Sequence, residues 1–204
     1  MLQLHAVSNQ LLGVLNRLQK LSIFKNYRLV GGTALALQWG HRESIDIDLF
    51  GNDFIDSEEI ISELKIFDNL KILKRGKLIN IFVIEGIKVD IVNYNYKWLD
   101  EAIFIDGLTM ASPKDIAAMK INAITGRGSK KDFIDLFFLL KHYSLKDIYS
   151  FFEQKYPDGT LFLAYKSLIY FDDADQQTSP KVYFDTTWEE IKEEIELQYK
   201  KLDY

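Results

Sequence analysis

The first part of the chain alternates between helical and strand patterns. Apolar residues at helical spacing predict an amphipathic helix over residues 2–21. Residues 27–32, YRLVGG, predict a short strand that runs into a glycine turn, and residues 33–40, TALALQWG, return to helical spacing. The run SIDIDLF, residues 44–50, has the strict alternation of a strand.

One more helix and a series of strands complete this part of the chain. A polar loop and a helix are predicted for residues 51–67, with Asp56 or Ser57 as the N-cap. Apolar and polar positions then alternate through residues 71–93, and glycine-containing turns interrupt them. The pattern is typical of an antiparallel meander.

The pattern becomes helical after a last predicted strand at residues 102–111. Ser112 and Pro113 are a typical N-cap and first helical residue. An acidic, polar loop is expected at residues 172–180. Helices are predicted over residues 112–126, 130–143, 144–156 and 186–202.

These patterns predict an α+β fold with a boundary near Ser112. Residues 1–111 should form a mixed sheet flanked by helices, and residues 112–204 should form a C-terminal helical bundle.

The composition limits the class of protein. The 204 residues suffice for one substantial domain or two small ones, and the chain has no cysteine, which excludes disulfides and thiolate metal sites. The three histidines are too far apart for the usual ligand spacings of zinc. The start of the chain lacks the pattern of a signal peptide and no apolar run is long enough to span a membrane, so we expect a cytoplasmic protein. A net charge of −5 argues against a protein that coats nucleic acid with its whole surface.

Two carboxylates interrupt the apolar strand at 44–50. Residues i and i+2 of a strand point to the same side, so Asp46 and Asp48 should project together while Ile45, Ile47 and Leu49 face a core. Two carboxylates roughly 7 Å apart repel each other unless a cation compensates them, and Mg²⁺ prefers such oxygen ligands. Taken alone, this short pattern is better explained by an exposed edge strand with solvated aspartates.

Two further features occur on either side of this strand. Gly31 and Gly32 end the preceding strand and open a helix, where backbone N–H groups attract phosphate, although a tight turn alone also accounts for two glycines. Downstream, Asp90 is a lone carboxylate in a predicted strand and shares a face with Lys88. An exposed sheet face would also explain Asp90.

The joint spacing is more specific than any of its parts. The chain contains, in this order, an apolar residue, Gly-Gly, thirteen residues, Asp-apolar-Asp-apolar and, later, apolar-Asp-apolar. This order is similar to the signature of the nucleotidyltransferase superfamily with the DNA polymerase β-like core. The residues that carry the resemblance are Val30, Gly31, Gly32, Asp46, Ile47, Asp48, Leu49, Val89, Asp90 and Ile91.

A second motif narrows the resemblance. The segment from about Arg28 to Leu140 resembles the AbiEii/AbiGii toxin family, in which a K-x-x-A-x-x-x-R helix precedes a K-D-x-x-D segment. Two cations on one helical face with a small residue between them suit a multiply charged ligand, whereas a solvated face or a surface ion-pair cluster is the structural alternative. The matching residues are Lys120, Ala123, Arg127, Lys131, Asp132 and Asp135.

The resemblance implies a Mg²⁺-dependent nucleotidyltransferase. Asp46, Asp48 and Asp90 would hold two Mg²⁺ ions, and Lys120 would complete the catalytic set by neutralising charge on the nucleoside triphosphate. Arg42 would contact phosphate or instead brace one of the helical aspartates. The expected substrate-binding residues are Gly31, Gly32, Thr33, Arg42, Ser44, Arg127, Asp132 and Asp135.

The resemblance also implies a partner and an acceptor. The chain would be the toxin of an abortive-infection type of toxin–antitoxin system, paired with a cognate antitoxin, and some members of the family modify the 3′ end of tRNA. Basic residues of the meander are candidates for contacting such an acceptor, although an ordinary solvated turn has the same composition. These residues are Lys71, Lys74, Arg75 and Lys77.

Other functions remain compatible with the residues. The acceptor could be a small molecule or a protein side chain, and the chain could be a nucleotide-binding regulatory module without catalysis. The full set of two glycines, three aspartates and Lys120 argues against a silent module. A purely structural domain would leave three strand aspartates unexplained.

Overall fold

The structure is a computed structural model that describes residues 1–202. Its contacts divide the chain into two compact units. Unit 1 consists of residues 1–97 and 101–111, and unit 2 takes residues 98–100 together with the chain from Ser112 onward. Residues 203 and 204, the end of the predicted helical half, lie outside the described residues.

Unit 1 is built on a seven-stranded mixed sheet with the order β3-β4-β5-β2-β1-β7-β6. Strands β2 and β5 pair in parallel, as do β1 and β7, and the other neighbours are antiparallel. The predicted meander is therefore confirmed as β3-β4-β5. The strands are β1 (Tyr27–Leu29), β2 (Asp46–Gly51), β3 (Lys71–Lys74), β4 (Ile79–Ile84), β5 (Ile87–Asn93), β6 (Ile103–Ile105) and β7 (Leu108–Met110).

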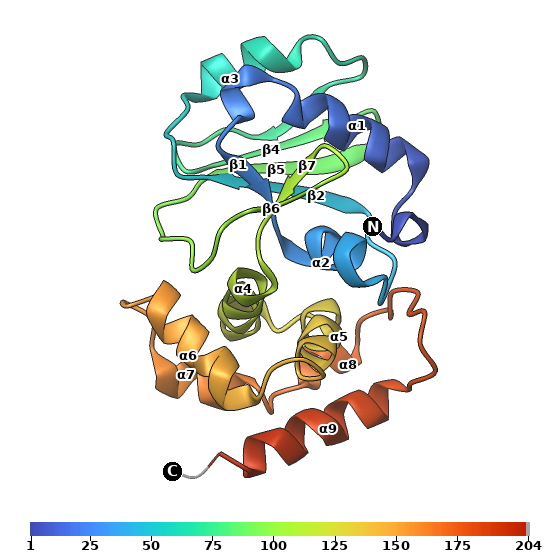
Figure 1. Cartoon of the computed structure of the whole chain (residues 1–204), viewed down its shortest axis with the longest axis vertical. Helices are drawn as coiled ribbons and strands as arrows, with labels where there is room; N and C mark the ends of the chain where they lie inside the picture. The colour runs from blue at the N-terminus through green and yellow to red at the C-terminus, as the bar shows by residue number, and fades with distance from the viewer. Residues whose placement is uncertain (203–204) are drawn as a thin grey trace. The chain divides into compact units, whose positions relative to one another are not determined.

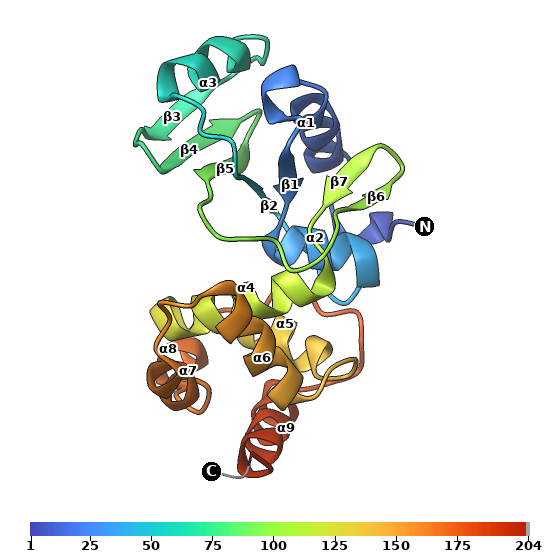
Figure 2. The ribbon, with the colours of Figure 1, turned by 60° about the vertical axis from the view of Figure 1, so that its left-hand side comes forward.

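One face of the sheet forms the core of unit 1. Ile47 and Leu49 of β2 are fully buried, as are Val89 and Ile91 of β5, because alternate residues of each strand project to this face. Figures 1 and 2 show helices α1 and α3 on one side of the sheet and α2 on the other. The prediction that Ile45 faces the core is wrong: this residue precedes β2 and is 68% exposed.

The helices of unit 1 differ from the predicted ones mainly at their starts. The single helix predicted over residues 2–21 is two elements, because Val7 is extended and Ser8 begins a new helix by accepting a hydrogen bond from the backbone of Leu11. Asp56 caps α3, as one of the two predicted candidates. The helices are η1 (Leu4–Ala6), α1 (Asn9–Gln19), η2 (Ser22–Phe24), α2 (Gly31–Trp39) and α3 (Ser57–Leu64).

The last predicted strand of unit 1 is a hairpin. Residues 102–111 contain two antiparallel strands, β6 and β7, joined by Asp106 and Gly107. Both turn residues have positive φ angles, 51° and 84°, which is the backbone of a type I′ hairpin turn. The Asp-Gly pair is the sequence signal for this turn.

Unit 2 consists of helices. Ser112 caps the first of them and Pro113 occupies its first turn, as predicted. The predicted loop at 172–180 contains the short helix α8, and α7 was not predicted. No helix within residues 1–202 is long and apolar enough to cross a membrane. The helices are α4 (Pro113–Arg127), α5 (Lys130–Leu139), α6 (Leu145–Lys155), α7 (Leu161–Ser167), α8 (Asp172–Asp175) and α9 (Trp188–Lys200).

A buried ion pair explains why residues 98–100 belong to unit 2. Lys155 Nζ lies 2.7 Å from Asp115 Oδ1, and neither side chain is exposed. The Asp115 carboxylate also accepts hydrogen bonds from the backbone N–H groups of Leu99 and Asp100, and the Lys155 ammonium lies 4.6 Å from the ring centroid of Trp98. The segment is thereby fastened to α4 and α6.

Candidate active site

Strands β2 and β5 bring the aspartates of unit 1 together. Because the two strands pair in parallel, Asp48 lies directly beside Asp90, and Asp46 lies beside Lys88. All of these side chains project to the face opposite the core, and the three aspartates are half-buried. The predicted set of Asp46, Asp48 and Asp90 is thus placed on one face of two adjacent strands.

The glycine turn approaches Asp48 closely. Gly31 has a φ of 67°, and a Cβ atom at this position would lie 2.7 Å from Asp48 Oδ2. The backbone N–H of Val30 donates to the carbonyl oxygen of Asp48 over 2.9 Å. Only glycine combines this backbone conformation with this approach, so Gly31 keeps the start of α2 against the carboxylate.

Thr33 and Ser44 connect the start of α2 to the start of β2. The Thr33 hydroxyl donates to the backbone carbonyl of Asp46, and its oxygen lies 2.8 Å from Ser44 Oγ. Both side chains are buried. The backbone N–H of Ser44 donates to the carbonyl oxygen of Ala6 over 2.8 Å. These contacts fix the backbone of Asp46 at the start of β2.

The remaining predicted binding residues of unit 1 are also buried. Gly32 lies in the first turn of α2, next to Gly31, where the backbone N–H groups have no partner in the preceding turn of the helix. Arg42 is 3% exposed and donates from Nη1 to the carbonyl oxygen of Glu43 over 2.8 Å. Burial leaves little of Arg42 open to solvent.

A lysine that the predicted site omitted lies against the third aspartate. Lys88 Nζ is 2.6 Å from Asp90 Oδ1, and the two side chains are 43% and 20% exposed. The sequence signal for this contact is their i, i+2 spacing in one strand. The ammonium compensates part of the negative charge that Asp46, Asp48 and Asp90 place on this face.

The chemistry of these side chains fits a hard divalent cation. Asp46, Asp48 and Asp90 lie on one face of the sheet and supply the carboxylate oxygens that Mg²⁺ prefers as ligands. Among residues 1–202, no group of three or more His, Cys, Asp or Glu side chains is arranged closely enough to hold a metal ion. In this arrangement an ammonium, rather than a third carboxylate, contacts Asp90.

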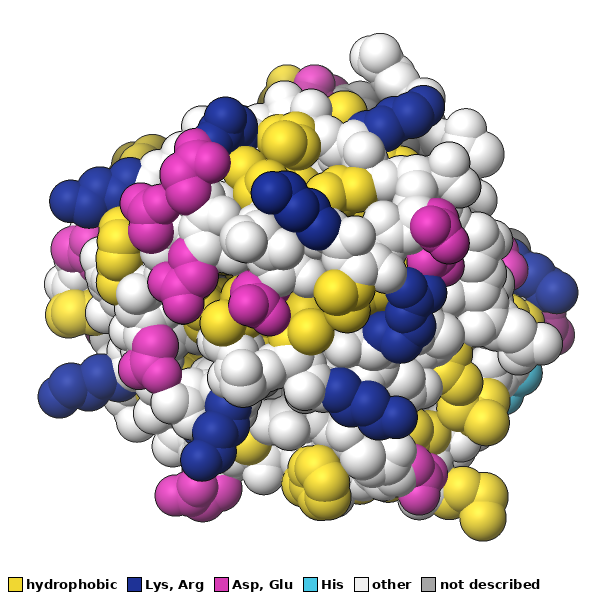
Figure 3. Space-filling model, turned by 90° about the horizontal axis from the view of Figure 1, so that it is seen from above, with side chains coloured by type: hydrophobic (Ala, Val, Ile, Leu, Met, Phe, Trp, Pro, Cys, Tyr) yellow, Lys and Arg dark blue, Asp and Glu magenta, His cyan; other side chains and the backbone are white. Residues whose placement is uncertain are grey.

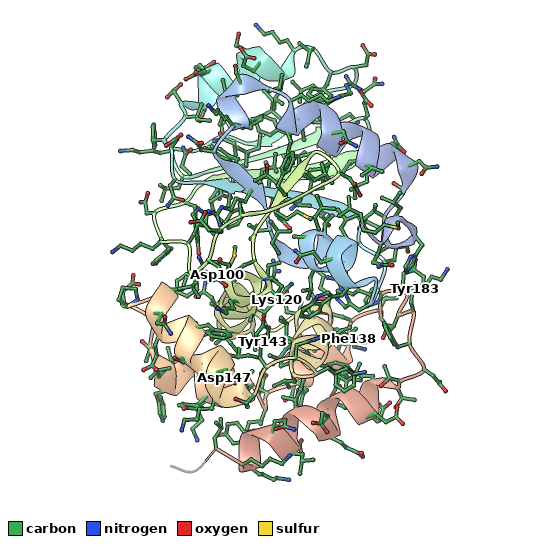
Figure 4. The ribbon with its side chains drawn as sticks, in the orientation of Figure 1. Asp100, Lys120, Phe138, Tyr143, Asp147 and Tyr183 are labelled. Carbon is green, nitrogen blue, oxygen red and sulfur yellow. The ribbon has the colours of Figure 1, made fainter. Side chains whose placement is uncertain are left out.

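The predicted residues of unit 2 form a buried ionic network. Lys120 of α4 lies 2.8 Å from Asp132 Oδ1 and 2.6 Å from Asp135 Oδ2, both on α5. Neither aspartate is exposed, and the Lys120 side chain is 5% exposed. Figure 4 shows Lys120 inside the helical unit. The alternative of a solvated helix face is therefore wrong for Lys120, and the alternative of a surface ion-pair cluster is wrong for Asp132.

Asp132 collects further donors. Arg127 Nε lies 2.9 Å from Asp132 Oδ2, and Ser129 Oγ donates to the same oxygen over 2.5 Å. Burial alone would raise the pKa of this carboxyl group, but the charges of Lys120 and Arg127 outweigh it and hold the pKa of Asp132 well below its usual value. The Arg127 side chain itself is 60% exposed.

The predicted site residues thus form two groups, each within its own unit. Unit 1 holds Gly31, Gly32, Thr33, Arg42, Ser44, Asp46, Asp48 and Asp90, and unit 2 holds Lys120, Arg127, Asp132 and Asp135.

Comparisons with known proteins identify the family of the chain. A family model described as nucleotidyl transferase AbiEii toxin, Type IV TA system, matches residues 13–200. A protein of Aquifex aeolicus (strain VF5) named aq_aa25 is 35% identical in an alignment over 193 residues. The alignment covers 92% of this chain and 93% of that protein.

Solved structures share the fold. JHP933 from Helicobacter pylori has a TM-score of 0.56 at 21% identity and covers 96% of this chain and 94% of its own. MenT4, a nucleotidyltransferase toxin from Mycobacterium tuberculosis, has a TM-score of 0.59 at 14% identity and covers 93% and 81%. The predicted α+β fold with a mixed sheet is confirmed. Since the family model spans most of the sequence, the chain belongs to the AbiEii family of nucleotidyltransferase toxins and is a nucleotidyltransferase.

Proposed function

We propose that this enzyme transfers a nucleoside monophosphate from a nucleoside triphosphate to the 3′-terminal hydroxyl of tRNA. It would act in the cytoplasm as the toxin of an abortive-infection system and would be restrained by a cognate antitoxin. The observation that carries the proposal is the pairing of Asp48 with Asp90 directly beside the close approach of Gly31. Family membership supports the reaction type and the toxin role.

The residues of unit 1 have distinct roles in this proposal. Asp46, Asp48 and Asp90 would hold Mg²⁺, two ions in our expectation, and the bound metal supplies charge stabilisation for the attacking and leaving oxygens. The first N–H groups of α2, at Gly31 and Gly32, would bind the β and γ phosphates. Thr33 would position this turn, because its hydroxyl is engaged with Ser44 and the Asp46 carbonyl.

The reaction is an in-line displacement at the α-phosphorus. The acceptor oxygen forms a bond to this phosphorus, the bond to the bridging oxygen breaks, and pyrophosphate leaves. The proton of the acceptor hydroxyl passes to solvent. The roles that the resemblance gives Lys120, Arg127, Asp132 and Asp135 stay predictions, since within unit 2 these residues neutralise one another.

The test is a transfer assay with total tRNA, Mg²⁺ and each common nucleoside triphosphate labelled at the α-phosphate. We expect label on tRNA with the wild type and none with Asp48→Ala. Asp68→Ala, at an exposed position of unit 1, is the charge-matched control and should keep full activity. Label on the protein or on a small molecule would replace tRNA as the acceptor. The absence of transfer and of nucleotide binding would refute the proposal.

A further inference from the structure

The strand register places a lysine of the sheet edge on the same face as the aspartates. Directly paired residues of neighbouring strands project to the same face. Asp90 of β5 pairs with Ile81 of β4, and Ile81 pairs with Lys74 of β3, the edge strand. With strands about 4.8 Å apart, the backbone of Lys74 lies roughly 10 Å from that of Asp90.

A second lysine reaches this face because β3 is irregular. Lys88 pairs with Val83, and Val83 pairs with Lys71. Lys71 and Lys74 are three residues apart, so a regular strand would point them to opposite faces. The register shifts between Ile72 and Lys74, however, and the extra residue returns Lys74 to the face of Lys71.

Partly exposed apolar side chains lie between the lysines and the aspartates. All residues of β3 are exposed. On β4, Ile81 and Val83 are half-buried and Ile79 is 38% exposed, whereas Phe82, which points to the core, is fully buried. We name this face of β3 and β4 the basic platform and define it by Lys71, Lys74, Ile79, Ile81 and Val83.

The charge of the platform suits a polyanion. Residues 71–77, KILKRGK, contain four basic residues and no acidic one. Within residues 1–202, neither Lys71 nor Lys74 takes part in an ion pair. The opposite face differs: Figure 3, viewed from above over α1 and α3, shows basic side chains scattered among acidic and apolar ones. Lys71 and Lys74 therefore lie on the same face of the sheet as the carboxylates, and the apolar side chains of β4 lie between them.

We propose that the basic platform binds the single-stranded 3′ end of the acceptor RNA. Lys71 and Lys74 contact its phosphates, and its riboses and bases lie against the apolar side chains of β4. This orientation leads the terminal hydroxyl toward the aspartates. The inference rests on the proposed function, because it takes RNA as the acceptor, and it locates where that acceptor is held.

A protein strand added to the edge of the sheet fits these observations less well. Strand addition needs a regular row of free backbone groups, and both a bulge and lysines on an edge strand oppose it. The lysines also share a face with the aspartates instead of alternating across the strand. This arrangement favours a ligand that lies on the face over one that pairs with the edge.

The test measures binding of a fluorescein-labelled single-stranded RNA oligonucleotide by fluorescence anisotropy, without nucleoside triphosphate, over a range of salt concentrations. Combined Lys71→Ala and Lys74→Ala substitutions should weaken binding several-fold and make the slope of log affinity against log salt shallower by about 1.4, or about 0.7 per lost phosphate contact. The matched control combines Lys25→Ala with Lys65→Ala, at exposed positions of unit 1, and should bind as the wild type does.

An exchange of two residues within β3 separates the effect of the face on which the ammonium lies from the effect of the net charge. Ile72 pairs with Phe82 and therefore lies on the opposite face, and this residue is 43% exposed. Ile72→Lys combined with Lys74→Ile keeps composition and net charge but moves the ammonium across the strand. We expect this exchange to weaken RNA binding as much as Lys74→Ala does.

Equal RNA affinity for the wild type and the Lys71/Lys74 variant would overturn the proposal. If that variant also aggregates, the lysines protect the sheet edge instead. Failure of the proposed function gives a different result: RNA binding then depends on the platform, but the wild type transfers no nucleotide to any RNA.

Discussion

At the scale of single residues, Gly31 is the position where backbone and chemistry depend on each other most directly. Its φ of 67° and the distance of 2.7 Å from a Cβ atom to Asp48 Oδ2 leave no place for a side chain. We expect Gly31→Ala to lower the free energy of unfolding by about 1–2 kcal/mol from the backbone conformation alone, and to abolish nucleotide transfer by displacing Asp48.

Gly13 provides the control for this substitution. It lies in the middle of α1, and a Cβ atom there would meet no atom within 4 Å. Gly13→Ala should therefore raise the free energy of unfolding by about 0.5–1 kcal/mol and leave activity unchanged. Denaturant titrations and the transfer assay measure both effects. Equal stability of the two variants would contradict the role given to Gly31.

Lys88 leads to a prediction about the metal alone. Its ammonium lies 2.6 Å from Asp90 Oδ1 and competes with a divalent cation for that carboxylate. Lys88→Met should bind Mn²⁺ more tightly than the wild type in the absence of nucleotide, by up to about fivefold, since a partly exposed ion pair contributes up to about 1 kcal/mol. Calorimetric titration with Mn²⁺ measures the change.

The exposed Lys65 supplies the control for Lys88, since Lys65→Met removes the same charge from another surface of unit 1. Its affinity for Mn²⁺ should equal that of the wild type. Weaker binding of Mn²⁺ by Lys88→Met would mean that the ammonium organises the carboxylates instead of competing for them.

Sequence patterns predicted these residues as far as local spacing determines them. The i, i+2 rule correctly placed Asp46 and Asp48 on one face, but it also placed Ile45 in the core. Ile45 is exposed because β2 begins one residue later, at Asp46. Alternation gives the face of a residue only within a strand, and it does not fix the residue at which the strand begins.

At the scale of elements, helices α4 and α5 are joined by charge. Asp132 on α5 is buried, but Lys120 and Arg127 of α4 hold its pKa well below the ordinary value of 3.8. A carboxyl group with a lowered pKa in the folded state stabilises the protein above its ordinary pKa, and this stabilisation is lost as the pH falls toward the folded-state value. Unit 2 should therefore lose stability below about pH 4.

Asp132→Asn tests this sign. At pH 7 the free energy of unfolding of the variant should be about 3 kcal/mol lower than that of the wild type, because Lys120 and Arg127 lose a charged partner. The difference should shrink as the pH falls below about 4, because there the Asp132 carboxyl group of the unfolded wild type takes up a proton while that of the folded protein stays ionised. Denaturant titrations at a series of pH values measure it. A difference that stays constant down to pH 3 would contradict the assignment.

The elements that sequence analysis missed follow from contacts or turns of short range. The break after η1 depends on the Ser8 cap, which is one polar residue within a continuous apolar pattern. The β6–β7 hairpin depends on Asp106 and Gly107, whose Asp-Gly signal was present in a run that alternation alone treated as one strand. The register of β3, which brings Lys74 beside Ile81, cannot be deduced from the sequence, because a bulge has no pattern of its own.

At the scale of the whole molecule, contacts distant in sequence decide how the chain divides. The buried pair of Asp115 and Lys155 is forty residues apart and gathers residues 98–100 into unit 2. Hydrophobic periodicity depends only on residues close in sequence. It could therefore predict a boundary near Ser112, but not that residues 98–100 belong to unit 2. The same limit applies to the buried network of Lys120, whose burial follows from the packing of α4 with α5.

The net charge of the molecule leads to a last prediction, about how its affinity for RNA depends on salt concentration. A chain with a net charge of −5 and a pI near 5.3 cannot bind RNA through its whole surface, so binding must come from a few local cations. If Lys71 and Lys74 supply most phosphate contacts, log affinity of the wild type for single-stranded RNA should fall with log salt with a slope of about −1.5 to −3. Anisotropy titrations at several salt concentrations give this slope. A value steeper than about −5 would require many more phosphate contacts than the basic platform can provide, and would place the RNA across a wider surface.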